Sequence, residues 1–432
     1  MIDIELLRNN LEYVRENYKK RNDPEILKIL DRAVEMDKKW RELITEVNNL
    51  RKEKNKINQK IVELKSKGKE IPQDLLIKAK EIDKKIEGVE KERKKVEKER
   101  KYWLMRLPNL LHESVPYGKD DSENVEIRRW GEPPKFDFEP KDHVTILKNL
   151  GLMDLERAAK VAGRGFYYLK EELVILDFAL QKFAVDFLRK RGFKLIEPPY
   201  MLKREAYEGV TDLADFDLQL YKIEGENLHL IATSEHPMAA MFMNEVLNKD
   251  QLPILLTGIS PCFRKEVGSH GKYTKGLFRV HQFNKIEQFV FCLPEDSWEW
   301  HEKLQENVEA LLQQLGLHYR VVNVCTGDIG IVAAKKYDTE VWMADGKFRE
   351  VASNSNCTDF QARRLNIRYR EKEGAPVKGF VHTLNSTAIA TSRTMIGIIE
   401  QYQQADGTVK IPKVLWKYTG FKKLEPRDDI KW

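Results

Sequence analysis

Two long, narrow apolar stripes near the amino terminus constrain this chain most. Between residues 26 and 64, apolar side chains recur in alternating steps of three and four, and only Lys54 breaks the register. A second stripe runs from Leu75 to Leu107, after the helix-breaking segment SKGKEIPQD at 66–74. A lone helix cannot bury such a seam. The two stripes therefore predict two helices that fold back on each other as an antiparallel coiled coil.

Charge is concentrated in this arm. Residues 1–107 hold 30 Lys and Arg against 22 Asp and Glu, a net charge of +8, whereas the rest of the chain carries −2 of the total of +6. A basic arm on a near-neutral body favours a polyanionic partner such as RNA or DNA. Most coiled coils join proteins, so a dimerisation rod is the alternative interpretation.

Several classes of protein are excluded by composition. No apolar run approaches the roughly 18–20 residues of a membrane-spanning helix, so we expect no membrane association. The start MIDIELLRNN has acids at Asp3 and Glu5 and no signal-peptide pattern, which predicts a cytoplasmic protein. The four cysteines, Cys262, Cys292, Cys325 and Cys357, form no CxxC pair and have no zinc-ligand spacing. We expect them to be buried thiols.

The remaining residues predict a linker and a second domain. Residues 108–140 are rich in Pro and Gly and have no sustained periodicity, which indicates a linker that docks partly on the body. From residue 141 amphipathic helices mix with short β-rich runs, HLIATS, PILLTGIS, FRVHQF and QFVFCL, without regular alternation of strand and helix. We expect an α+β fold with an antiparallel sheet, divided into an arm at 1–107, a linker at 108–140 and a domain at 141–432.

The first of three informative segments of this domain reads as a helix followed by a strand. Leu173, Leu176, Leu180, Phe183 and Phe187 share one face of the predicted helix. Gly192 ends the helix, and a strand follows that stops at the prolines 198 and 199. Taken alone, this segment is typical of a core helix and an edge strand.

The second segment, PCFRKEVGSHGKYTKGLFRVHQFNKIEQFVF, predicts a strand, a Gly-studded basic loop at 265–276, and a second strand. Alternation along the second strand places five side chains on one face: Arg279, His281, Phe283, Lys285 and Glu287. Arg264 and Glu266 share another face. Such side chains make a poor core, but they suit a flat ring and phosphate groups. A surface ladder of salt bridges is the alternative.

The third segment, HTLNSTAIATSRTMIGIIE, predicts a strand that enters a helix near Thr387 or Ala388, with Arg393 in the second turn of that helix. A helix N-terminus and an arginine together favour an anion. The alternative is a capped core helix with an exposed arginine. The sequence has neither a GxxxxGK[ST] nor a GxGxxG motif, so arginines on a sheet would have to bind any phosphate.

With these segments in place, the chain resembles the seryl-tRNA synthetases of the class II aminoacyl-tRNA synthetase family. GFKLIEPP matches motif 1, FRKE with RVHQFNKIE matches motif 2, and LNSTAIATSRTMIGIIE matches motif 3. The basic arm, TSE at 233–235 and NSNCTDFQARR add specificity. The resemblance implies a coiled-coil arm joined to a class II catalytic domain, whose mixed, mainly antiparallel sheet is flanked by helices.

The resemblance also implies site residues. Arg264 would hold the α-phosphate of ATP, Glu266 the adenine amino group, and Phe283 and Arg393 the two faces of the adenine ring. Catalysis is assigned to Arg264 and Arg393, and magnesium to Glu350 and Ser353, which need a bulge between them to share a face. The ATP site comprises Arg264, Lys265, Glu266, Val280, Phe283, Glu350, Val351, Ala352, Ser353 and Arg393. The serine site comprises Thr233, Ser234, Glu235, Glu287 and Thr387.

The implied activity is ATP-dependent formation of seryl-adenylate, followed by transfer of serine to tRNA(Ser). Magnesium is the expected metal and zinc is not, the expected assembly is a homodimer through motif 1, and tRNA(Sec) is left open as a second tRNA. Departures are few: Asn354 stands where many members have Cys, and TSE replaces the common TAE. Two alternatives remain. One is a non-catalytic paralogue that binds RNA or protein, and the other is a class II enzyme for threonine, proline or glycine.

Overall fold

The computed structural model describes residues 1–211, 218–267, 274 and 276–430. It consists of two compact units. Residues 2–19 and 23–107 form the smaller unit, and residue 1, residues 20–22 and the chain from Pro108 onward form the larger one.

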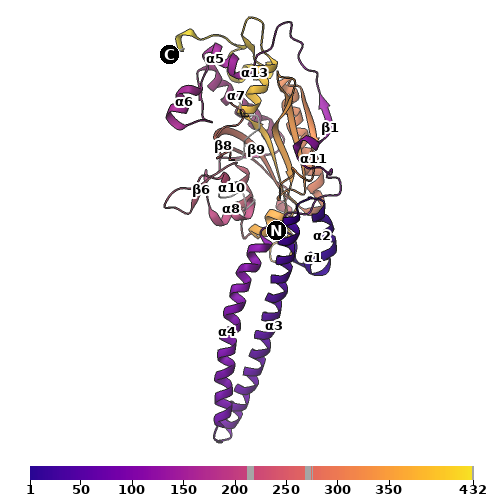
Figure 1. The fold of residues 1–432 in the computed structure, drawn as a ribbon, viewed down its shortest axis with the longest axis vertical. Helices are drawn as coiled ribbons and strands as arrows, with labels where there is room; N and C mark the ends of the chain where they lie inside the picture. Colours follow the sequence, from indigo (N-terminus) through magenta and orange to yellow (C-terminus); the bar gives the residue numbers. More distant parts are fainter. Residues whose placement is uncertain (212–217, 268–273, 275, 431–432) are drawn as a thin grey trace. The chain divides into compact units, whose positions relative to one another are not determined.

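The smaller unit is a helical hairpin. Its helices are α1 (Ile4–Asn9), α2 (Leu11–Lys19), α3 (Pro24–Ser66) and α4 (Gln73–Leu104). Helix α3 begins after Asp23, whose side chain accepts a hydrogen bond from the backbone of Glu25, with Pro24 in the first turn. Helices α3 and α4 run antiparallel beside each other, as Figure 1 shows. The antiparallel hairpin expected from the two apolar stripes is confirmed.

Polar groups complete the seam of the hairpin. Lys54, which interrupts the apolar register, forms an ion pair across the hairpin with Asp83. Asp37 is buried in the seam, where it binds Arg8 of α1 at 2.9 Å and Arg100 of α4 at 2.7 Å. Burial alone would raise the pKa of the Asp37 carboxyl, but the two arginines lower it. These ion pairs connect the helices α1, α3 and α4.

The larger unit is built on an eight-stranded sheet in the order β1-β10-β11-β12-β15-β9-β8-β4. Its strands are β1 (Val125–Trp130), β4 (Lys194–Ile196), β8 (Ile254–Phe263), β9 (Gln282–Cys292), β10 (Tyr319–Asn323), β11 (Lys335–Trp342), β12 (Phe348–Asn356) and β15 (His382–Ala390). Every pair is antiparallel except β4 with β8, which is parallel. The expected mixed, mainly antiparallel sheet is therefore confirmed.

The register of this sheet shifts at three of the described strand pairs, and between β1 and β10 the extra residue is Ile127. Between β11 and β12 the register jumps, so that Val351 is the extra residue. Between β9 and β15 the extra residue is Ala388. A bulge turns the side chains that flank it toward a common face. The bulge expected between Glu350 and Ser353 is thereby confirmed.

Helices cover both faces of the sheet. The main core packs α7 (Glu172–Lys190), α11 (Ser297–Leu315) and α13 (Thr391–Gln401) against Ile286 and Val290 of β9. On the other face a second core packs α8 (Arg204–Val210), α10 (Glu235–Ala240) and α12 (Phe360–Leu365) against Phe289 and Phe291. Phe289 and Phe291 of β9 thus face α8, α10 and α12, and Figure 1 shows α8 and α10 beside β8 and β9.

Smaller elements surround the sheet. The helices are α5 (His143–Leu150), α6 (Leu155–Ala162) and α14 (Trp416–Thr419), and the strands are β2 (Met153–Asp154), β3 (Tyr168–Leu169), β5 (Met201–Lys203), β6 (Leu228–Leu230), β7 (Val246–Asn248), β13 (Arg368–Arg370), β14 (Val377–Phe380), β16 (Val409–Lys410) and β17 (Lys423–Leu424). They form a three-stranded sheet, β14-β13-β7, and three two-stranded pairs.

The predicted linker at 108–140 docks on the main sheet, because its strand β1 pairs with β10 at the edge of that sheet. Two expectations from the sequence were wrong in detail. The strand β15 continues through Ala390, so the helix begins at Thr391 and Arg393 lies in its first turn. Because β15 is buried on both faces and contains a bulge, its sequence does not alternate between polar and apolar residues, and the end of the strand could not be located. The run FRVHQF is a strand only from Gln282 onward.

Other expectations fare differently. All four cysteines are buried free thiols, as expected. In the helix α7, four of the five predicted core residues are buried and Phe187 packs partly buried against the core. Most of the basic loop at 265–276 lies outside the described residues. None of the helices in the described part of the chain is both long enough and apolar enough to span a bilayer.

Candidate active site

A pocket of about 580 Å³ opens on the face of the sheet to which Lys285 and Glu287 point. Its wall combines the strands β9, β12 and β15, the start of α10, the segment after β8, and residues 329–333 between β10 and β11. Strand alternation explains the polar lining, because Ile286 between the two charged residues faces the main core.

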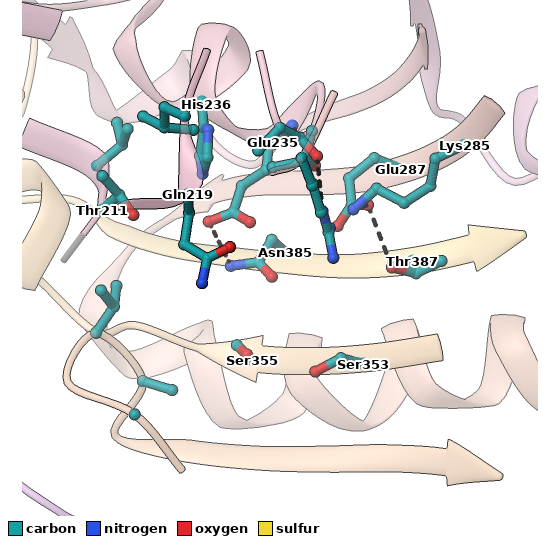
Figure 2. Close-up of a pocket in the computed structure, with 18 of the residues that line it drawn as sticks. Thr211, Gln219, Glu235, His236, Lys285, Glu287, Ser353, Ser355, Asn385 and Thr387 are labelled. Carbon is teal, nitrogen blue, oxygen red and sulfur yellow. Dashed lines mark hydrogen bonds and ion pairs between the residues drawn. The ribbon is translucent and has the colours of Figure 1, made fainter. Parts of the chain in front are cut away.

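Two glutamates, Glu235, which is half-buried, and Glu287, which is buried, dominate one end of the pocket. Glu235 is the first residue of α10, and Glu287 lies on β9 with only 1% of its surface exposed. Figure 2 shows both carboxylates turned into the same pocket, above the strand that carries Asn385 and Thr387. Two carboxylates so close in a dry site repel each other, so each needs its own partners.

The partners of the two glutamates differ. Glu287 forms an ion pair with Lys285, with 2.5 Å between Nζ and Oε2, and accepts a hydrogen bond from the Thr387 hydroxyl at 3.3 Å. Glu235 accepts hydrogen bonds only from neutral amides in the described structure: Asn385 at 3.1 Å and Gln361 at 3.2 Å. Glu287 is therefore neutralised by Lys285, whereas Glu235 can bind a cationic group that enters the pocket.

Burial and charge shift the acidities of these groups. Burial, reinforced by the neighbouring Glu287, raises the pKa of Glu235 to about 7. Burial also raises the pKa of Glu287, although Lys285 opposes the shift. The buried imidazole of His236, close to Lys285 and Arg264, has its pKa lowered to about 3 and is neutral. A bound cation would stabilise the ionised form of Glu235.

The other end of the pocket is rich in arginine. Arg264 follows β8, donates to the carbonyl oxygen of Ala232 at 3.2 Å, and lies 5.1 Å from the centre of the Phe283 ring. Arg279 and Glu266 form an ion pair at 2.7 Å in the same wall. Glu266 has a φ of 52°, a left-handed conformation that turns its side chain out of the line of the strand.

Arg393 reaches this region from the first turn of α13. Its guanidinium binds the Glu350 carboxylate at 3.2 Å and lies 4.5 Å from the ring centre of Phe278. Burial opposes ionisation of Glu350, but Arg393 and Lys336 outweigh it and lower the pKa of this carboxyl. The site thus holds an ionised carboxylate beside an arginine.

The oxygen atoms near Glu350 suit a hard cation. The bulge at Val351 places Glu350 and Ser353 in one wall, and the buried carboxyl of Asp338 lies opposite Ser353. Carboxylate and hydroxyl oxygens are ligands that Mg²⁺ accepts. Among the described residues no cluster of three His, Cys, Asp or Glu side chains could hold a metal unaided. A cation here would need phosphate oxygens as further ligands.

The structure brings many of the predicted site residues together. Those in the pocket wall are Thr233, Glu235, Arg264, Glu266, Glu287, Glu350, Ser353 and Thr387. Outside the wall, as far as the described residues go, are Ser234, Lys265, Val280, Phe283, Val351, Ala352 and Arg393. Phe283 and Arg393 contact wall residues directly, and Val280 packs in a small cluster with Phe283.

Two of these residues differ from expectation. The side chain of Ser234 is fully buried and points at the sheet, where a Cβ on Gly258 would lie 2.6 Å from its hydroxyl oxygen. The ammonium of Lys265 lies 6.0 Å from the ring centre of Tyr221, beside the pocket wall. Neither side chain is aimed at the glutamates.

Sequence reasoning placed Arg279 and Lys285 on the charged face but gave neither a specific role, and it missed Gln361 and Asn385. Lys285, Gln361 and Asn385 bind the two glutamates, and Arg279 binds Glu266. Alternation was a usable signal for two of them. Lys285 lies two residues before Glu287, and Asn385 lies two residues before Thr387. Gln361 comes from a helix, and no local pattern links it to Glu235.

Comparisons with known proteins agree with this geometry. A family model described as the tRNA synthetase class II core domain (G, H, P, S and T) matches residues 219–402, and the seryl-tRNA synthetase N-terminal domain matches residues 1–111. The curated serine–tRNA ligase of Thermococcus onnurineus is 55% identical, over 99% of this chain and 97% of the relative.

Solved structures show the same likeness. The seryl-tRNA synthetase from Pyrococcus horikoshii complexed with ATP superposes with a TM-score of 0.95 at 51% identity, over 99% of this chain and all of the other. The cytoplasmic serine–tRNA ligase from Naegleria fowleri in complex with AMP gives 0.89 at 36% identity, over 99% of both chains. Fold and pocket therefore define a class II tRNA synthetase. Within that class, the chain belongs to the seryl-tRNA synthetase family.

Proposed function

We propose that this protein is an ATP-dependent ligase that joins L-serine to AMP, releases pyrophosphate, and transfers the seryl group to the 3′ end of tRNA(Ser). The observation that carries the proposal is one pocket with two chemically distinct ends. Arginines and an aromatic ring occupy one end, and two glutamates occupy the other. A nucleotide and a small amino acid fit these ends side by side.

The nucleotide belongs at the arginine end. Arg264 binds the α-phosphate, Phe283 lies under the adenine ring, and Arg393 covers the ring from the other side and reaches the γ-phosphate. The 5.1 Å separation of Arg264 from the Phe283 ring supports this arrangement. Glu266 accepts from the adenine amino group once its bond to Arg279 rearranges. Backbone at Lys265, Val280, Val351 and Ala352 completes the ATP site.

Magnesium belongs with Glu350 and Ser353, whose oxygens the bulge at Val351 places in one wall. When bound, the ion neutralises phosphate charge and holds the polyphosphate in place. No zinc is needed for this set of oxygen donors.

Adenylation at this site needs no general base. The serine carboxylate is already ionised near neutral pH when it attacks the α-phosphorus, and pyrophosphate leaves. The protein contributes orientation of the two reactants and stabilisation of negative charge by Arg264 and Arg393.

The serine molecule belongs at the glutamate end. Glu235 and Thr233 bind its ammonium group, and Glu287 and Thr387 bind its hydroxyl group. Alanine lacks the hydroxyl group and makes neither contact, so the pocket should bind alanine more weakly than serine. Threonine must be excluded by the bulk of its extra methyl group.

The helical hairpin belongs to the tRNA. Its charge of +8 supports contact with phosphates, and RNA helices are recognised mainly through shape and backbone. We assign it the long variable arm of tRNA(Ser), and tRNA(Sec) is a second substrate if it presents the same arm. The larger unit then carries catalysis, and residues 1–107 carry tRNA binding.

A second copy of this chain belongs at the open edge of the sheet. Ile175 and Phe178 on α7 and Leu195 on β4 are 42%, 60% and 44% exposed, and β4 is the edge strand. Exposed apolar side chains beside a free strand edge are typical of an interface. We propose a homodimer through this edge. The free thiols are consistent with a reducing cytoplasm.

The test is ATP–pyrophosphate exchange with serine, alanine, threonine, proline and glycine as separate substrates. Serine should give the highest kcat/KM by at least about 10²-fold. Exchange with another amino acid and none with serine would refute the assignment to serine. If no amino acid supports exchange, the non-catalytic alternative takes its place.

A further inference from the structure

Arg21 and Asn109 are buried residues of the larger unit. They lie at the two crossings, the points where the chain enters the hairpin helices α3 and α4 and where it leaves them. Arg21 lies in the short segment between α2 and α3, and Asn109 lies five residues beyond the end of α4. Their exposed fractions are 7% and 4%. Neither is part of the pocket wall as described, yet both bind backbone atoms of that wall.

Arg21 binds the loop between β10 and β11. One guanidinium nitrogen donates to the carbonyl oxygen of Gly330 at 2.6 Å, and another donates to the carbonyl oxygen of Asn109 at 2.8 Å. Gly330 has a φ of 74°, in the left-handed region that favours glycine, and it lines the pocket. Arg21 thus links this turn to the residue at the other crossing.

Asn109 makes more contacts with the wall. Its backbone nitrogen donates to the carbonyl oxygen of Ile331 at 2.7 Å. Its side-chain amide donates to the carbonyl oxygens of Val332 at 2.9 Å and Cys357 at 2.8 Å. All three acceptors belong to residues that line the pocket. Because buried carbonyl groups are costly without donors, this one amide fixes two separate strips of the wall relative to each other.

From Cys357 the chain of contacts reaches the serine end of the pocket. The Asn385 amide nitrogen lies 3.6 Å from the Cys357 sulfur and donates to Oε1 of Glu235 at 3.1 Å. Asn109 is thus connected to Glu235 through two intermediate residues, Cys357 and Asn385.

We propose that Asn109 and Arg21 are positioning residues for the serine end of the pocket. They hold residues 330–332 and Cys357 so that Asn385 presents Glu235 to the amino group of the substrate. The proposal rests on the proposed function and goes beyond it. It assigns the two crossings a part in amino acid activation, separate from any contact of the hairpin with RNA.

The proposal is tested by Asn109→Ala and Arg21→Ala in the full chain, with Asn323→Ala as matched control. The Asn323 amide also donates to a backbone oxygen, that of Ser114 at 2.8 Å, in a partly buried hydrogen bond that lies outside the pocket wall described above. KM for serine, KM for ATP and kcat are measured by ATP–pyrophosphate exchange, together with the melting temperature. We expect a rise of about tenfold in the serine KM for both variants, with ATP KM and kcat within about twofold of wild type.

A merely structural role predicts another pattern. It would lower the melting temperature and the active fraction, hence kcat, and leave the serine KM unchanged. That pattern, or an equal rise of the serine KM in Asn323→Ala, overturns the proposal. If the alanine variants do not fold, Arg21→Lys replaces them, because lysine keeps the positive charge but can make only some of the hydrogen bonds that arginine makes. A wild-type serine KM in a folded Arg21→Lys protein that has lost the Gly330 contact in its crystal structure would count against the proposal.

Failure of this inference is separable from failure of the proposed function. If the wild-type chain gives no exchange with serine, the function is wrong. If the wild type exchanges serine and the variants match it, only the positioning role is wrong.

Discussion

The acidity of Glu235 makes serine activation depend on pH in a calculable way. With a pKa of about 7 in the empty pocket, the carboxyl is largely protonated at pH 6 and largely ionised at pH 8. In the role proposed for Glu235, the ammonium group of serine binds the ionised form of this carboxyl group. The ionised fraction changes from about 0.09 to about 0.9 over this interval, so kcat/KM for serine should rise about tenfold.

The assay is ATP–pyrophosphate exchange at saturating ATP, with serine varied at each pH. Saturating ATP matters because burial also raises the pKa of Asp338, which lies opposite Ser353 of the pocket wall, to about 7. Glu235→Gln should give a low and nearly flat profile, since the titrating group is gone. Glu340→Gln is the matched control: burial also raises the pKa of Glu340, but that residue binds Arg320 outside the pocket wall described here. It should keep the wild-type profile.

The reasoning fails if the wild-type kcat/KM for serine is flat between pH 6 and 8. It also fails if Glu235→Gln retains the wild-type inflection, because another group would then be titrating.

Three further predictions concern the arginine end of the pocket and the hairpin. Arg264→Ala should lower exchange by about 10²-fold, since one preorganised phosphate ligand is lost, whereas Arg320→Ala should stay close to wild type. Asp37→Ala should destabilise the hairpin by about 2–3 kcal/mol in urea unfolding, because Arg8, Arg41 and Arg100 lose a buried partner. Since the pKa of Asp37 is lowered on folding, the wild type should lose this stabilisation as the pH falls through that pKa. Replacing residues 35–100 by a short Gly-Ser turn should abolish tRNA charging and leave exchange intact; loss of both activities would contradict a role for the hairpin confined to tRNA.

Much of the fold was predictable because periodicity reports burial directly. The two apolar stripes specified the hairpin, and Lys54 interrupted them only because it pairs with Asp83. The charged face of β9 was visible for the same reason: Lys285 and Glu287 alternate with core residues. What could be read from the sequence was, in each case, a local repeat.

Features set by tertiary contacts were not predictable. Asp37 looks like an ordinary surface acid until α1 and α4 bring arginines to it. The start of α13 was misplaced because β15 is buried on both faces, so its residues carry no alternation. Gln361 approaches Glu235 across 126 positions of sequence, and Asn109 approaches Cys357 across 248. No local sequence pattern predicts contacts between residues so far apart in the chain.

One measurement tests the central claim most directly: esterification of radiolabelled serine to purified tRNA(Ser) by the wild-type chain, with and without ATP. The account predicts ATP-dependent formation of seryl-tRNA(Ser). A catalytically competent preparation that activates an amino acid but esterifies none of the serine to this tRNA would contradict it.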